Sequence, residues 1–191
     1  MTERAERFKE IFTRKIKRAG ADKLLEWLES TDFFKAPASR KHHGAYPGGL
    51  VDHSLNVYYA LIGNFKTRNM CTEESHAIVA LLHDVCKIGY YYPEIKRKKN
   101  SEGKWENAPG WGISDSLPMG HGEKSVYLIQ KYMQLTDDEA LAIRWHMGAY
   151  DEAYKGGSYA LNAAMRKTPL VLALHYADMT ATQDEQDREE L

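Results

Sequence analysis

The sequence has few cysteines, and they are not spaced as a metal-binding pair. Cys71 and Cys86 are the only two in 191 residues. So low a number excludes the disulfide framework of small secreted domains and is typical of proteins from a reducing compartment. We therefore predict a cytoplasmic protein without disulfide bonds.

The chain also lacks a long apolar run and an excess of charge of either sign. Residues 1–18 alternate charged with apolar side chains, so they contain neither the core of a signal peptide nor a membrane span. Lys plus Arg total 26 and Asp plus Glu total 27, which gives a net charge of -1. A balance of this kind gives no overall attraction to nucleic acid or to anionic membranes. We expect no membrane partner, and we expect anionic molecules to be bound only by local groups of cations.

Apolar residues recur mainly at helical spacing, which predicts an all-α fold. With 43% hydrophobic residues the chain can bury one core, so we expect a single domain over residues 1–191. Helical patterns cover the N-terminal segment 3–30 and return in 50–65, 73–88, 123–133, 137–147 and 170–179. A long loop over 32–49 is expected between the first two groups of helices, because it contains prolines, glycines and paired histidines.

Two segments depart from the helical pattern. Between Tyr90 and Trp111 the periodicity fails, and aromatic or basic runs flank the turn-like residues 100–103. We predict a small β-hairpin inserted near residues 90–111. Acidic residues dominate after residue 183, so residues 183–191 are expected to form a solvated tail.

Two carboxylates stand on segments that are apolar enough to be buried. His83 and Asp84 end the apolar run 77–82, and Asp178 follows the apolar run 170–174 with only His175 beside it. A buried carboxylate is costly without a cation, and a metal ion would supply one. Imidazole and carboxylate together suit divalent Zn, Mn, Fe, Co or Ni. The alternatives are that backbone groups satisfy the His83-Asp84 pair and that His175 satisfies Asp178.

The order of these residues resembles the HD-domain superfamily of metal-dependent phosphohydrolases. Its pattern is a histidine, a His-Asp pair, optional histidines and a distant aspartate on a helical core. The matching segments are 48–55 around His53, 82–89 around His83 and Asp84, 120–123 around His121, 144–148 around His146, and 176–178 ending at Asp178. The resemblance covers a core of about residues 40–182. Its first part, residues 42–49, is similar to exoribonuclease-type and phage-type HD proteins.

The resemblance implies a set of metal ligands. One ion would be held by His53, His83, Asp84 and Asp178. A second would be held by His121 and His146, with Asp84 bridging the two. One or two divalent ions, with the identity among Mn, Co, Ni, Fe and Zn left open, would activate water to cleave phosphomonoester or phosphodiester bonds.

Further residues are candidates for binding the substrate. Lys87 resembles the lysine of the family's His-Asp-x-x-Lys variant and is a candidate catalytic and phosphate-binding residue beside Asp84. Its alternative role is that of a cation at a helix C-terminus. His42 and His43 are accessory substrate-binding candidates, although paired loop histidines more often face solvent. The basic run 96–99 with Lys104 is either a guide for an anionic substrate or a solvated face.

The resemblance favours a small phosphorylated substrate of the nucleotide type, with short single-stranded nucleic acid as a further possible partner. Some relatives with two metals carry a second histidine where this chain has Met147. That difference keeps two alternatives open. One is a diiron oxygenase with a similar order of ligands, and the other is a noncatalytic, nucleotide-binding regulatory domain.

Overall fold

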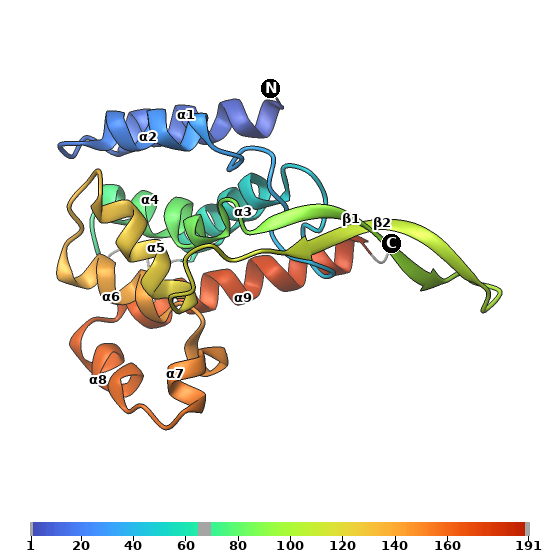
Figure 1. The fold of residues 1–191 in the computed structure, drawn as a ribbon. Helices are drawn as coiled ribbons and strands as arrows, with labels where there is room; N and C mark the ends of the chain where they lie inside the picture. Colours follow the sequence, from blue (N-terminus) through green and yellow to red (C-terminus); the bar gives the residue numbers. More distant parts are fainter. Residues whose placement is uncertain (1, 65–69, 190–191) are drawn as a thin grey trace.

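Two helices at the N-terminus lie across one end of the molecule (Figure 1). The computed structural model describes residues 2–64 and 70–189. In it α1 spans Glu3–Lys15 and α2 spans Ala21–Ser30, which confirms the predicted N-terminal helices. Thr2 caps α1 by accepting a hydrogen bond from the Ala5 amide, and Phe8 and Phe12 are buried on its inner face.

The central helices enclose the core. They are α3 (Gly49–Gly63), α4 (Glu73–Leu82), α5 (His121–Gln130), α6 (Asp137–Trp145) and α9 (Leu170–Glu189). α3 packs against both α4 and α9, and α6 packs against α5 and α9. Residues 77–82 of α4 are completely buried, so both the sides and the end of this helix lie inside the protein.

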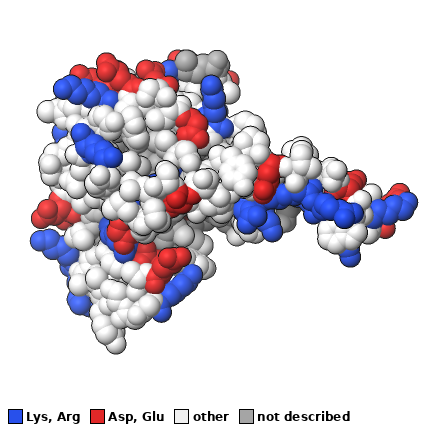
Figure 2. Space-filling model, viewed as in Figure 1, with Lys and Arg blue, Asp and Glu red and all other residues white. Residues whose placement is uncertain are grey.

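A β-hairpin interrupts the helices, as the sequence predicted. Strands β1 (Tyr91–Lys99) and β2 (Trp105–Ile113) pair antiparallel, from Tyr91 opposite Ile113 to Lys99 opposite Trp105. Asn100 stabilises the turn, because its side-chain oxygen accepts hydrogen bonds from the amides of Glu102 and Lys104. The hairpin projects away from the helices, and basic side chains gather along it (Figures 1 and 2).

Two parts of the chain differ from the sequence prediction. The acidic segment expected as a solvated tail from residue 183 continues α9 to residue 189; residues 183, 184, 187 and 188 are exposed, whereas Glu185 is only 8% exposed. The segment between residues 148 and 167, for which no element was predicted, forms the short helices η2 (Gly148–Tyr150), α7 (Glu152–Lys155) and α8 (Ala160–Lys167). The remaining short helix, η1, spans Val85–Lys87. The protein is thus mostly helical, with one two-stranded sheet in the described part.

None of the helices in residues 2–64 and 70–189 combines the length and the apolar character needed to cross a bilayer.

Candidate metal centre

The histidines and aspartates singled out in the sequence come together between α3, α4, α5, α6 and α9. His53 lies in α3 and His121 begins α5, whereas Asp178 comes from α9. His83 and His146 are the C-terminal caps of α4 and α6. Asp84 follows His83 directly. Residues that are far apart in the sequence therefore form one cluster, because the helices that carry them pack against each other.

The backbone orients two of the histidine rings. Nδ1 of His83 lies 2.9 Å from the Ala80 carbonyl oxygen, and Nδ1 of His146 lies 2.7 Å from the Ile143 carbonyl oxygen. Because a carbonyl oxygen can only accept, each Nδ1 carries the proton and each Nε2 of the neutral ring keeps a lone pair. Within the described part of the chain both buried Nε2 atoms lack a hydrogen-bond partner. Two buried lone pairs of this kind call for a cation.

The two oxygens of Asp84 face different pairs of histidines. Oδ2 lies 3.3 Å from Nε2 of His83 and 3.8 Å from Nε2 of His53. Oδ1 lies 2.9 Å from Nε2 of His121 and 3.5 Å from Nε2 of His146. The carboxylate therefore stands between two groups of ligand atoms.

Asp178 contacts the first of these groups. Its Oδ1 lies 3.1 Å from Nε2 of His53 and 3.9 Å from Nε2 of His83. His175 instead directs Nδ1 to the carbonyl oxygen of His146, at 2.6 Å. The alternative interpretation, in which His175 satisfies Asp178, is therefore not the arrangement found.

These separations suit divalent metal ions. Two ligand atoms that are each about 2.1 Å from one ion, at tetrahedral or octahedral angles, lie about 3.0 to 3.4 Å apart. The groups His53-His83-Asp178 and His83-Asp84-His146 each bring one ligand atom per residue within 4.8 Å of one another. The donors are imidazole nitrogens and carboxylate oxygens, which first-row divalent metals accept. The residues present therefore fit such an ion.

Charge interactions in the cluster shift the pKa values of its members. Burial alone would raise the pKa of Asp84, but the charge of Lys87, together with the neighbouring histidines, holds it well below its usual range. Burial would lower the pKa of His53, but hydrogen bonds to Asp178 and Glu185 outweigh it and raise the pKa to about 9. A metal ion that binds Nε2 of His53 must therefore compete with a proton at that nitrogen.

Lys87 is buried beside the cluster. Its Nζ donates to Oδ2 of Asp84 at 2.6 Å, which keeps the pKa of Lys87 above its usual value despite burial. It also lines the two cavities that adjoin the cluster. The structure thus places this residue next to the predicted metal ligands.

The two accessory histidines lie in different surroundings. The ring of His43 is 4.8 Å from that of His53, centroid to centroid, and burial lowers the pKa of His43 to about 4. His42 is exposed, and its backbone amide donates to Ser39. Only His43 is therefore brought to the cluster.

Glu185 is a contact of the site that the sequence interpretation missed. Its Oε2 lies 3.2 Å from Nδ1 of His53, and its Oε1 accepts a hydrogen bond of 2.6 Å from Asn56. A carboxylate behind a ligand histidine fixes the ring and increases its basicity. The signal was present, because Glu185 stands two helical turns after Asp178 and on the same face of α9.

Cys86 is also near the cluster, grouped with Asp84 and His121. Burial, reinforced by the charge of Asp84, raises the pKa of the Cys86 thiol to about 12. A metal ion that bound this thiol would therefore have to displace its proton.

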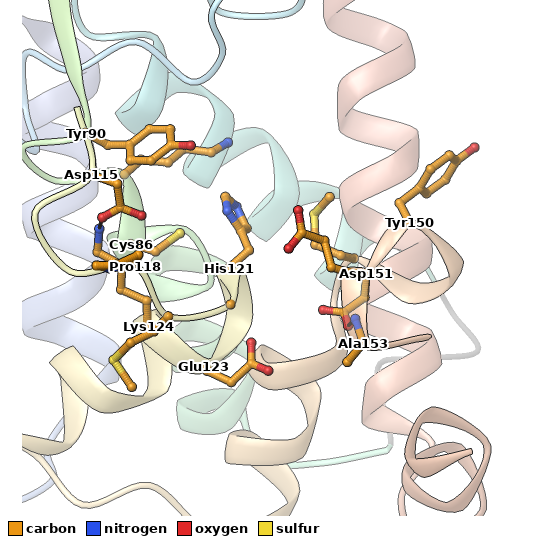
Figure 3. Close-up of a pocket in the computed structure, with 15 residues that line it drawn as sticks. Cys86, Tyr90, Asp115, Pro118, His121, Glu123, Lys124, Tyr150, Asp151 and Ala153 are labelled. Carbon is orange, nitrogen blue, oxygen red and sulfur yellow. Dashed lines mark hydrogen bonds and ion pairs between the residues drawn. The ribbon is translucent and has the colours of Figure 1, made fainter. Parts of the chain in front are cut away.

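Two cavities adjoin the cluster. One, of about 320 Å³, is lined by the histidines at 43, 53, 121 and 146 together with Asp84 and Asp178. The other, of about 430 Å³, lies beside His121, between Tyr90 and Asp115 on one side and Tyr150 and Asp151 on the other (Figure 3).

Comparison of the chain with family models, curated proteins and solved structures found no match in any of the three.

Proposed function

We propose that the protein is a metal-dependent phosphohydrolase that cleaves phosphate esters, in nucleotides or short oligonucleotides. The observation that carries the proposal is the position of Asp84, whose two oxygens face two different pairs of imidazole nitrogens. The buried, unpartnered Nε2 atoms of His83 and His146 support it. The order of the ligands along the chain supports it as well, through the resemblance to HD-domain proteins.

Each residue of the cluster has a proposed role. His53, His83 and Asp178 hold one divalent cation, and His121 and His146 hold a second, with Asp84 shared. A bound divalent cation supplies Lewis acidity to a phosphoryl group and to water. Burial of the ligands keeps competing water away and strengthens the electrostatic interactions inside the site.

Lys87 has the proposed role of contacting the substrate phosphate. Its ammonium group lines both cavities and is paired only with Asp84 in the described structure. Once a cation shares the charge of Asp84, the ammonium group is available to a phosphate oxygen. A compact positive charge suits that task.

The test is a reconstitution experiment without oxygen. Protein stripped of metal and reloaded with Mn, Co or Ni should release phosphate or nucleoside monophosphate from a panel of nucleotides. Asp84→Asn should abolish turnover and weaken metal binding, whereas Lys87→Ala should keep the metal and lose turnover or phosphate affinity. Unchanged kinetics in Lys87→Ala would exclude the role proposed for that lysine.

The same experiment separates the two alternatives. Met147 stands where some relatives with two metals carry a second histidine, and this difference is what keeps a diiron oxygenase open. Met147 also lines both cavities. Activity that appears only with iron and air, with consumption of oxygen, would establish that alternative. Nucleotide binding to metal-loaded protein without turnover in either assay would favour a regulatory domain.

A further inference from the structure

The cavity of about 430 Å³ beside His121 shares walls with the candidate metal centre. The residues that line both cavities are Lys87, His121, Met147 and Tyr150. A molecule whose phosphate lies at the cluster can therefore extend past His121 into this second space. Its volume is in the range of roughly 300–1,000 Å³ in which proteins bind small molecules. It has room for one nucleoside-sized group but not for a polymer.

The cations that line this cavity are already paired. Nζ of Lys124 lies 2.6 Å from Oδ1 of Asp115, and Nζ of Lys87 lies 2.6 Å from Oδ2 of Asp84. Lys124 is buried as well, so its ammonium group is held in place. Lys87 has the proposed role of contacting the phosphate that reacts, and Lys124 is held by Asp115, so neither lysine is left to neutralise a second anion in the cavity.

Carboxylates are in excess on the opposite side. Glu123 and Asp151 both pair with the same guanidinium group, that of Arg144. Glu152 also lines the cavity, is exposed, and forms no ion pair among residues 2–64 and 70–189. The cavity is therefore negatively charged and rich in hydrogen-bond acceptors.

Two aromatic rings complete the walls. Tyr90 stands next to the Lys124 ammonium group, which lies 5.4 Å from the centre of its ring. Tyr150 lies across the cavity on the other side of His121 (Figure 3). Flat faces of this kind suit a planar group in the ligand.

We propose that this cavity binds the alcohol part of the substrate, and that the substrate is a phosphate monoester of a single nucleoside-sized alcohol without a second phosphate group. The inference rests on the proposed function and restricts it. The alcohol donates hydrogen bonds to the carboxylates and is uncharged or cationic, because an additional phosphate would meet negative charge and no free cation. In the reaction the oxygen of water bonds to phosphorus and the bond from phosphorus to the ester oxygen breaks. The alcohol leaves with one proton of the water, and inorganic phosphate is the other product.

The experiment compares four substrates on the metal-loaded protein. They are a nucleoside 5′-monophosphate, the matching 5′-diphosphate, the matching dinucleotide and p-nitrophenyl phosphate. Hydrolysis of p-nitrophenyl phosphate reports the intrinsic activity of the metal centre on a simple ester. The kcat/KM of each nucleotide substrate is divided by the kcat/KM of p-nitrophenyl phosphate. We expect the monophosphate to exceed the diphosphate and the dinucleotide at least about tenfold. Equal or better use of either of the larger substrates would overturn the inference while leaving the proposed function intact.

Charge reversal at Glu152 tests whether the negative charge of the cavity disfavours a second phosphate group in the substrate. Glu152→Lys should reduce the preference for monophosphate over diphosphate by about tenfold, and Glu152→Gln should reduce it less. Glu102→Lys, the same charge change at the tip of the hairpin, is the matched control and should leave the ratio unchanged. A ratio in Glu152→Lys equal to that of the wild type would contradict the assignment.

Binding measurements keep the two proposals separate. If none of the four substrates is hydrolysed with any metal, the proposed function fails. Calorimetric titration of the metal-loaded protein with monophosphate and diphosphate then tests the cavity without turnover. The cavity assignment is supported if the wild type binds the monophosphate more tightly than the diphosphate and Glu152→Lys shows the opposite order. It is refuted if both proteins bind the two ligands with equal affinity.

Discussion

Glu185 contacts His53 on the side of the ring that faces away from the other candidate ligands. Nε2 of His53 faces Asp178, whereas Nδ1 faces the buried Glu185 carboxylate, which Asn56 also holds. This contact fixes which nitrogen is presented to a metal. The residue is therefore a positioning residue in the proposed site.

Replacing Glu185 with Gln should lower metal affinity by about 10- to 100-fold, because the neutral amide no longer increases the basicity of His53. The measurement is competition for Mn or Zn with a chelator of known affinity. Asp184→Asn, which removes a neighbouring exposed carboxylate, is the control and should bind metal as the wild type does. Wild-type affinity in Glu185→Gln would show that the contact only packs the helix end.

Glu139 is a buried carboxylate outside the candidate metal centre. It accepts hydrogen bonds from Arg18, from the Ser75 hydroxyl and from the Thr136 amide. Burial would raise the pKa of Glu139, but the bond from Arg18 and its companions hold it below the ordinary value of 4.5. The stabilisation it gives is therefore fully present above pH 4.5 and is lost as the pH falls through the lower folded value.

We expect Glu139→Gln to lose about 2 kcal/mol of unfolding free energy at pH 7, because Arg18 loses its buried partner and is left with Glu74 at 3.4 Å. Its stability should also fall less than that of the wild type between pH 5 and pH 3. Urea unfolding at a series of pH values measures both effects. Parallel pH profiles for the two proteins would mean that folding does not lower the pKa of Glu139. Glu106→Gln, on the exposed hairpin, serves as the control.

At the scale of secondary-structure elements, the hairpin differs from the helices in how little of it is buried. In its outer half Ile95 is 70% exposed and Trp105 is 59% exposed, with Arg97 and Lys99 over the Trp105 ring. Its base is fixed instead by Trp111, whose ring nitrogen donates to the Ala45 carbonyl oxygen. The outer half adds little to the core.

Shortening the hairpin should therefore leave the fold intact. Joining the paired residues Lys96 and Ala108 through Asn-Gly, in place of residues 97–107, keeps the register and supplies a tight type I′ turn. We expect the unfolding free energy to change by less than about 1 kcal/mol, which is a shift in Tm of about 2–4 °C at most. Thermal unfolding by circular dichroism measures this. A larger loss would show that the outer half makes stabilising contacts.

At the scale of the whole molecule, the candidate ligands join helices that are far apart along the chain. His53 belongs to α3, whereas Asp178 belongs to α9, and α3 packs along α9. A cation bound between them stabilises the folded state only, since the unfolded chain has no such site. Metal binding and global stability are therefore linked.

Adding Mn or Zn at about 100 times its dissociation constant should stabilise the protein by about 2.7 kcal/mol. In a chain of this size that corresponds to a rise in Tm of about 5–10 °C. Differential scanning calorimetry with and without metal measures the shift, and a chelator should reverse it. Asp178→Asn should show a much smaller rise. An equal rise in that variant would place the stabilising ion elsewhere.

Local patterns in the sequence predicted most of the helices and their beginnings. Thr2, Thr72 and Thr136 stand directly before predicted helical segments and cap α1, α4 and α6, the last in a capping box with Glu139. The hairpin is confirmed too, because the change from helical spacing to aromatic and basic runs is visible along the chain. The segment 148–167 was not predicted, since its helices are short and little of α7 is buried. Caps, helical spacing and hairpin turns depend on residues that are close together in the chain, so they can be predicted from the sequence alone.

The sequence by itself therefore determined the helices, the hairpin and the identity of the candidate ligands. Only the tertiary structure decided how those ligands face one another. The contact between His53 and Glu185 joins residues that are 132 positions apart, and no periodicity relates them. The division of the Asp84 oxygens between two pairs of histidines, and the acidic cavity beside His121, likewise arise from the packing of α3, α4, α5, α6 and α9. Distances between side chains on different helices depend on how the whole core is filled, which spacing along one helix does not specify.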